Sequence, residues 1–132
     1  MKDILVIDNN KMFLEYMKEV LSAEGYSVVT AEGGIEAFDS LTENVPDVIF
    51  VDLIMPQIEG DRLCKIFKSR RELKDTRVVI VSATAAEEGK VEFSHLADAY
   101  IAKMPFKKMK KPMLQLLADL DRGNTEPYKD RV

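Results

Sequence analysis

The sequence is poor in cysteine and has no long apolar segment. Cys64 is the single cysteine, so no disulfide can form within the chain; we expect a reducing compartment and interpret Cys64 as a small core residue. A membrane helix needs about 20 consecutive apolar residues, and the N-terminus reaches Asp8 too soon for the apolar core of a signal peptide. These absences predict a cytoplasmic protein.

The sequence also lacks a strong excess of one charge and the glycine patterns of nucleotide-binding proteins. Its 19 basic and 23 acidic residues give a formal charge of -4, which argues against general binding to nucleic acid or anionic membranes. Neither G-x-G-x-x-G nor G-x-x-x-x-G-K-[ST] occurs, so a nucleotide or flavin binder is disfavoured. What remains is a soluble chain of 132 residues, enough for one ordinary domain.

Three short, β-branched apolar runs indicate buried strands. They cover residues 4–7, 48–51 and 78–81 without polar alternation, as is typical of parallel strands that are covered on both faces. Further strands are expected at residues 26–31 and 100–102. Helices are expected at residues 34–43, 59–69 and, interrupted by a glycine, 84–96.

Two more helices have apolar stripes. The first ends near Gly25, and its stripe is Met12, Phe13, Tyr16, Met17, Val20 and Leu21. The last has the stripe Met109, Met113, Leu116, Leu117 and Leu120. A β-α unit therefore repeats five times, which predicts an α/β fold with a doubly wound open sheet. We assign residues 1–121 to this domain and residues 122–132 to a C-terminal tail or the start of a linker.

Polar residues end four of the five strands. Asp8 and Asn9 follow the first strand, Asp52 ends the third, Ser82 the fourth and Lys103 the fifth. Each alone has an ordinary explanation as a cap, a turn residue or a solvated lysine. Together they favour a site, because the carboxyl ends of parallel strands meet at one edge of the sheet.

This set of side chains suits a hard cation and phosphoryl chemistry. Asp8 and Asp52 would repel each other unless a cation lay between them, and Mg²⁺ accepts carboxylate, amide and carbonyl oxygens. Asp52 could then attack phosphorus while Lys103 neutralises charge on the phosphoryl oxygens, and Ser82 could donate a hydrogen bond to one of them.

The segments VIDNN, VDLIMPQIEG, VSAT and AYIAK resemble the receiver domain of two-component response regulators over about residues 3–120. The pattern D-x-x-x-P-x-x-x-G matches at Asp52, Pro56 and Gly60. The resemblance implies a flavodoxin-like (βα)5 doubly wound parallel sheet with strand order 2-1-3-4-5. It also implies a phosphoprotein of phosphorelay signal transduction that is not an enzyme, beyond catalysing its own phosphorylation and dephosphorylation.

The resemblance assigns a role to each residue at this edge. Asp52 is implied as the phosphoacceptor, Ser82 as the switch hydroxyl and Lys103 as the phosphate contact. Tyr100 is implied as a switch aromatic, with packing of an edge-strand aromatic on the last helix as an equal alternative. The implied Mg²⁺ ligands are Asp8, Asn9, Asp52 and the backbone carbonyl of Ile54.

Two positions depart from the family pattern. Asn9 stands where a second acidic residue is usual, so we expect weak Mg²⁺ binding. Met104 separates Lys103 from Pro105, which are adjacent in the family, and is expected to shift a cis bond to residues 104–105 or to make a small bulge.

The leading function is a receiver that a sensor histidine kinase or phosphotransfer protein phosphorylates, and that switches a face for a downstream protein or an attached output domain. The alternative is a pseudo-receiver that binds partners without being phosphorylated, motivated by Asn9 and Met104. An aspartate-nucleophile phosphatase is disfavoured because Ile54 stands where a second Asp is needed. The lysine-rich run at 103–111 is interpreted as a solvated or partner-docking face, with no direct binding of nucleic acid or membrane. A homodimer remains open.

Overall fold

The computed structural model describes residues 2–52, 60–82 and 97–124. Five parallel strands form one sheet in the order β2-β1-β3-β4-β5, which confirms the predicted order. The strands are β1 Asp3–Ile7, β2 Ser27–Ala31, β3 Val48–Asp52, β4 Arg77–Ser82 and β5 Ala99–Ala102. The helices are α1 Lys11–Ala23, α2 Gly34–Glu43, α3 Gly60–Ser69, the short 3-10 helix η1 Arg71–Leu73 and α4 Phe106–Asp121. The helix expected at 84–96 lies outside the described residues.

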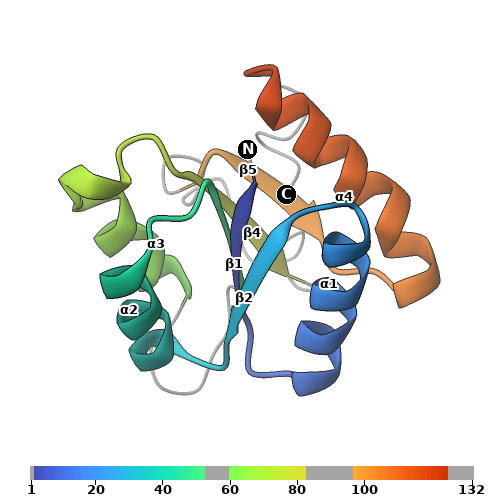
Figure 1. Ribbon diagram of the computed structural model, residues 1–132, viewed down its shortest axis with the longest axis horizontal. Coiled ribbons are helices and arrows are strands. Elements are labelled where there is room, and N and C mark those ends of the chain that lie inside the picture. The colour runs from blue at the N-terminus through green and yellow to red at the C-terminus, as the bar shows by residue number, and fades with distance from the viewer. Residues whose placement is uncertain (1, 53–59, 83–96, 125–132) are drawn as a thin grey trace.

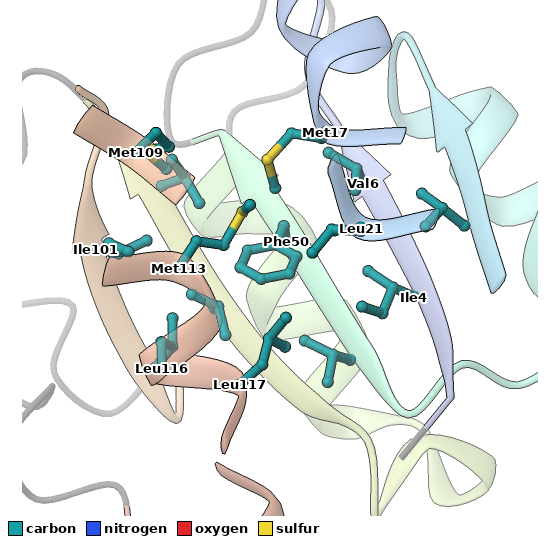
Figure 2. Close-up of a cluster of buried hydrophobic side chains, with 14 of the residues drawn as sticks. Ile4, Val6, Met17, Leu21, Phe50, Ile101, Met109, Met113, Leu116 and Leu117 are labelled. Carbon is teal, nitrogen blue, oxygen red and sulfur yellow. The ribbon is translucent and has the colours of Figure 1, made fainter. Parts of the chain in front are cut away.

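Helices cover both faces of this sheet. Figure 1 shows α1 and α4 on one side and α2 and α3 on the other. On the first face the strand residues Ile4, Val6 and Phe50 pack against Met17 of α1 and Met113 of α4 (Figure 2). On the second face the alternate strand residues Leu5, Ile7, Ile49 and Val51 pack against the helices, and the same cluster includes Leu63, Cys64 and Phe67 of α3. Burial on both faces explains why the strand sequences are apolar at successive positions.

Helix α1 begins at a side-chain cap. The Asn10 side-chain oxygen accepts a hydrogen bond from the Phe13 backbone N–H at 3.1 Å. The helix ends at Ala23, and Gly25 follows with a φ of 95°, a backbone conformation that glycine adopts readily. The predicted end of this helix is therefore confirmed.

The predicted stripe of α1 was wrong at its first position. Met12 is 68% exposed, whereas Leu14, which was left out, is 5% exposed and packs in the core. The buried residues Phe13, Leu14, Met17 and Leu21 instead follow the spacing i, i+1, i+4, i+8. The other five predicted positions, Phe13, Tyr16, Met17, Val20 and Leu21, all contact the core as expected.

Helix α4 confirms its predicted stripe. Met109, Met113, Leu116, Leu117 and Leu120 are all buried against the sheet and α1. Lys107, Lys108, Lys110 and Lys111 lie on its exposed side. None of the helices in the described part of the chain is long and apolar enough to cross a membrane.

The segment between β5 and α4 overturns one of the two arrangements expected at Met104, the cis bond, and leaves the small bulge as the other. Among the described residues no peptide bond is cis, so the bond between residues 104 and 105 is trans. Met104 is partly buried and packs against the α1–α4 face of the core. The Met104 side chain is therefore accommodated by packing on that apolar cluster, and the peptide bond that follows it is trans.

Candidate functional site

The register of the sheet brings the polar strand ends together. Ile7 pairs with Val51, so the residues that follow, Asp8 and Asp52, leave neighbouring strands at the same level. On the other side of β3, Asp52 pairs with Val81, and the next residue of β4, Ser82, pairs with Ala102. The edge of the sheet therefore carries Asp8, Asp52, Ser82 and Lys103 in spatial order.

Asp8 is a buried carboxylate whose two oxygens both accept hydrogen bonds. Its side chain is 1% exposed; Oδ1 accepts from the Asn10 backbone N–H at 2.9 Å and Oδ2 accepts from Lys103 Nζ at 2.7 Å. The Asp8 backbone N–H donates to the Ala31 carbonyl at 3.0 Å, which ties it to the end of β2. A buried charge is costly unless it is paired with an opposite charge. Lys103, which is distant from Asp8 in sequence, supplies that charge.

Lys103 also contacts an aromatic ring. Its Nζ lies 4.5 Å from the centroid of the Phe13 ring, and its side chain is 21% exposed. Phe13 is held beneath it by the Asn10 cap of α1. A cation over a ring face within about 6 Å is attracted to it, more strongly where water is excluded. The ammonium is therefore fixed between a carboxylate and an aromatic ring.

The Phe13 ring belongs to a larger aromatic contact between α1 and α4. Its centroid is 6.4 Å from that of Phe106, the first residue of α4. Phe106 in turn stacks on Tyr16, with centroids 4.4 Å apart and the rings 6° from parallel. The Tyr16 hydroxyl donates to the Phe106 carbonyl at 2.7 Å. We call Phe13, Tyr16 and Phe106 the aromatic joint.

The sequence predicted neither Asn10 nor the aromatic joint as part of this region. Asn10 had a detectable signal, because an Asn three residues before the first buried residue of a helix is typical of an N-cap. Phe13 and Phe106 had none, since they are distant in sequence and each also fits an ordinary apolar stripe. Burial raises the pKa of the Tyr16 hydroxyl above its ordinary value.

The other predicted site residues have different surroundings. Asp52 is half-buried at the end of β3, and Ser82 ends β4. Asn9 is exposed, and Ile54 lies outside the described residues. Tyr100 is 2% exposed and belongs to the cluster on the α2–α3 face. The alternative in which Tyr100 packs on the last helix was therefore wrong, because that helix covers the opposite face.

The donors at this edge fit a magnesium ion in chemical type. Asp8 and Asp52 offer two carboxylates from adjacent strands, and hard cations prefer such oxygens. Within the described ranges no three His, Cys, Asp or Glu side chains form a metal-binding group, so an ion would need amide, carbonyl or water ligands as well. It would also share Asp8 with the Lys103 ammonium, which is the cation already paired with that carboxylate.

Comparisons with known proteins agree on one family. A family model described as the response regulator receiver domain matches residues 4–113. The polar-differentiation response regulator DivK of Brucella ovis is 28% identical over 104 residues, covering 77% of this chain and 84% of that protein.

Solved structures give the same result. The response regulator TrrA of Thermotoga maritima, in complex with Mg²⁺-BeF, is 31% identical with a TM-score of 0.73 and covers 88% of this chain and 99% of that one. The chemotaxis response regulator CheY4 of Vibrio cholerae, at 24% identity, has the same fold with a TM-score of 0.78 and covers 88% of this chain and 98% of that one.

Proposed function

The chain belongs to the response regulator receiver domain family, and from this premise we propose that it accepts a phosphoryl group on Asp52. Receiver domains are signalling modules that interact with histidine kinases and downstream effectors. The donor proposed here is a sensor histidine kinase or a phosphotransfer protein. The observation that carries the proposal is the register that sets Asp52 beside the Asp8–Lys103 pair.

In the proposed reaction an Asp52 carboxylate oxygen attacks the phosphorus of a phosphohistidine. A P–O bond forms, the P–N bond breaks, and the electron pair of that bond stays on the histidine nitrogen. Lys103 stabilises the negative phosphoryl oxygens once its ammonium moves from Asp8 toward them. Bound Mg²⁺ would supply further neutralisation of the same oxygens.

Mg²⁺ is proposed to bind through Asp8, Asn9, Asp52 and the backbone carbonyl of Ile54. Binding is expected to be weak for two reasons. Asn9 contributes an amide where a carboxylate would add charge, and Lys103 already pairs with the Asp8 oxygen at 2.7 Å. Family membership supports the ion, because receiver domains typically bind it.

The remaining assignments follow from the same premise. Ser82 is proposed as the switch hydroxyl and Tyr100 as a switch aromatic on the α2–α3 side. Residues 1–121 are proposed as the receiver domain, with 122–132 as a tail or linker, because α4 ends at Asp121. The proposed location is the cytoplasm, and the proposed output is a downstream protein or an attached domain, with no direct contact to nucleic acid or membrane.

The deciding experiment is the intact mass of the protein after incubation with acetyl phosphate and Mg²⁺. We expect a gain of one phosphoryl group in the wild type and in Asp75→Asn, an exposed aspartate used as the matched control. Asp52→Asn should show no gain. No gain in any of the three, together with no response to millimolar Mg²⁺ by NMR, would contradict the proposal and favour the pseudo-receiver that only binds partners.

A further inference from the structure

We propose that the aromatic joint is a relay that carries the phosphorylation state of Asp52 to the start of α4, with Phe13 as the residue that positions Lys103. This inference rests on the proposed function, since it needs a phosphoryl group on Asp52. It assigns to the α1–α4 face a response that does not pass through Ser82 or Tyr100.

The first step is a competition for one ammonium. Lys103 Nζ lies 2.7 Å from Asp8 Oδ2 and 4.5 Å from the Phe13 ring centroid. A phosphoryl group on Asp52 would add a charge of about -1.5 to -2 on the strand next to Asp8. Because it carries more charge than the Asp8 carboxylate, it draws the ammonium toward itself and away from the ring.

The second step is the short connection between Lys103 and α4. Only Met104 and Pro105 separate Lys103 from Phe106, the first residue of the helix. Met104 is packed against the α1–α4 cluster, and Pro105 has a fixed φ. The backbone between the lysine and the helix is therefore short, and a displacement of the Lys103 backbone that accompanies the movement of its ammonium is passed to Phe106.

The third step is the contact that Phe106 makes with α1. Its ring stacks on Tyr16 at 4.4 Å, its carbonyl accepts the Tyr16 hydroxyl at 2.7 Å, and its side chain is 38% exposed. The contact between Tyr16 and Phe106 consists of one surface stack and one hydrogen bond. It is weak enough that a shift of either residue changes it. The Phe13 ring touches both Lys103 and Phe106, so it couples the two events.

The experiment is NMR of protein labelled with ¹³C-lysine and ¹³C-tyrosine. In the unmodified wild type, the ε-CH₂ protons of Lys103 should be shifted upfield by the ring current of Phe13. Phe13→Leu should remove that shift. Phe38→Leu is the matched control, because Phe38 packs edge-on against Phe67 on the other face with Arg70 5.2 Å from its ring. The control should leave the Lys103 signal unchanged.

The relay itself is tested by adding beryllofluoride and Mg²⁺, which mimic a phosphorylated aspartate. The upfield shift of Lys103 should be lost and the Tyr16 ring signals should move, whereas Asp52→Asn should show neither change. This arm uses the wild-type chain, so it decides the matter even if Phe13→Leu does not fold.

The outcomes separate the two proposals. If acetyl phosphate fails to modify Asp52, the proposed function is wrong, and the proposed relay is then wrong as well. If Asp52 is modified but the Lys103 and Tyr16 signals stay where they were, the relay alone is wrong. If the Lys103 protons show no ring-current shift before the addition, Phe13 does not position the ammonium and the inference is likewise overturned.

Discussion

Asp8 belongs to the candidate site, and its buried carboxylate would destabilise the fold if it lost its partners. Its carboxylate is 1% exposed and depends on Lys103 and on the Asn10 N–H for its partners. Breaking a buried pair by removing one partner costs more than the pair contributes, because the remaining charge is left buried. The identity of Lys103 therefore matters for stability as well as for chemistry.

We predict that Lys103→Met lowers the free energy of unfolding by about 3 kcal/mol, as expected for a buried charge that loses its partner. Urea unfolding measures this. Added Mg²⁺ should recover part of the loss and bind more tightly than in the wild type, because Asp8 Oδ2 no longer accepts from Lys103. The double variant with Asp8→Asn should be more stable than Lys103→Met alone; an equal loss in both would contradict this account of the pair.

A second carboxylate, Asp47, stabilises the start of the chain. Its Oδ2 accepts from the backbone N–H groups of Lys2 at 2.8 Å and Asp3 at 2.9 Å. The hydrogen bonds from Asp3 and then Lys2 lower the pKa of Asp47 below its usual value of 3.8. A lowered pKa in the folded state means that this stabilisation is complete above the unfolded-state pKa and is lost as the pH falls through the folded-state pKa.

We therefore predict that Asp47→Asn is less stable than the wild type at pH 7, by about 1 kcal/mol since the carboxylate is exposed. The difference should shrink below about pH 4, where the unfolded-state carboxyl is protonated. Urea unfolding of both proteins at pH 7 and at pH 3 measures it. A difference that stays constant over this range would show that the charge of Asp47 has no part in the effect.

At the residue scale, the sequence predicted the residues that end strands and missed those that support them. Asp8, Asp52, Ser82 and Lys103 could be found because strand ends in a parallel sheet share one edge. The contacts of Lys103 with Phe13 could not, since they depend on how α1 is rotated about its axis. That rotation is not contained in the period of the apolar residues alone.

At the scale of elements, the periodicity of apolar residues predicted where most helices and strands begin and end, because each element buries a complete face. The helix at Gly34–Glu43 and the stripe of α4 were predicted correctly for this reason. The 3-10 helix Arg71–Leu73 was missed, since three residues show no period. Met12 was misassigned because an apolar residue in the first turn can face solvent without disturbing the rest of the stripe.

Helix α4 contains a proline in its interior, where this residue disfavours helical structure. Pro112 lies inside the helix, where it cannot donate a hydrogen bond to the carbonyl of Lys108 and its ring crowds that carbonyl. We predict that Pro112→Ala raises the free energy of unfolding by up to about 3 kcal/mol, the difference in helix propensity between the two residues. Urea unfolding compares it with Lys111→Ala, an exposed neighbour that should change little. A less stable Pro112→Ala would mean that packing of the ring outweighs the missing hydrogen bond.

On the scale of the whole molecule, the two apolar clusters share one sheet. Successive residues of β1 and β3 point to opposite faces, so loss of the sheet would expose both clusters. We expect one cooperative unfolding transition for the described domain.

Cys64 offers a direct test of this cooperativity, because its thiol is buried in the α2–α3 cluster and it is the single cysteine. Met113→Ala lies on the opposite face and should cost about 2 to 5 kcal/mol. If the domain opens as one unit, a thiol reagent should label Cys64 at least about 10-fold faster in this variant under conditions where labelling follows opening. An unchanged labelling rate would show that the two faces open separately.

The ion pair between Asp8 and Lys103 has a consequence for the chain while it is being made. The two residues are 95 positions apart, so the carboxylate leaves the ribosome long before its partner does. A nascent chain that stalls or is cut before Lys103 can contain the last strand, which ends at Ala102, but it lacks α4 and would have to bury Asp8 with no ammonium beside it. Such fragments should remain unfolded and be degraded. The ion pair therefore favours complete chains over truncated ones before any signal is received.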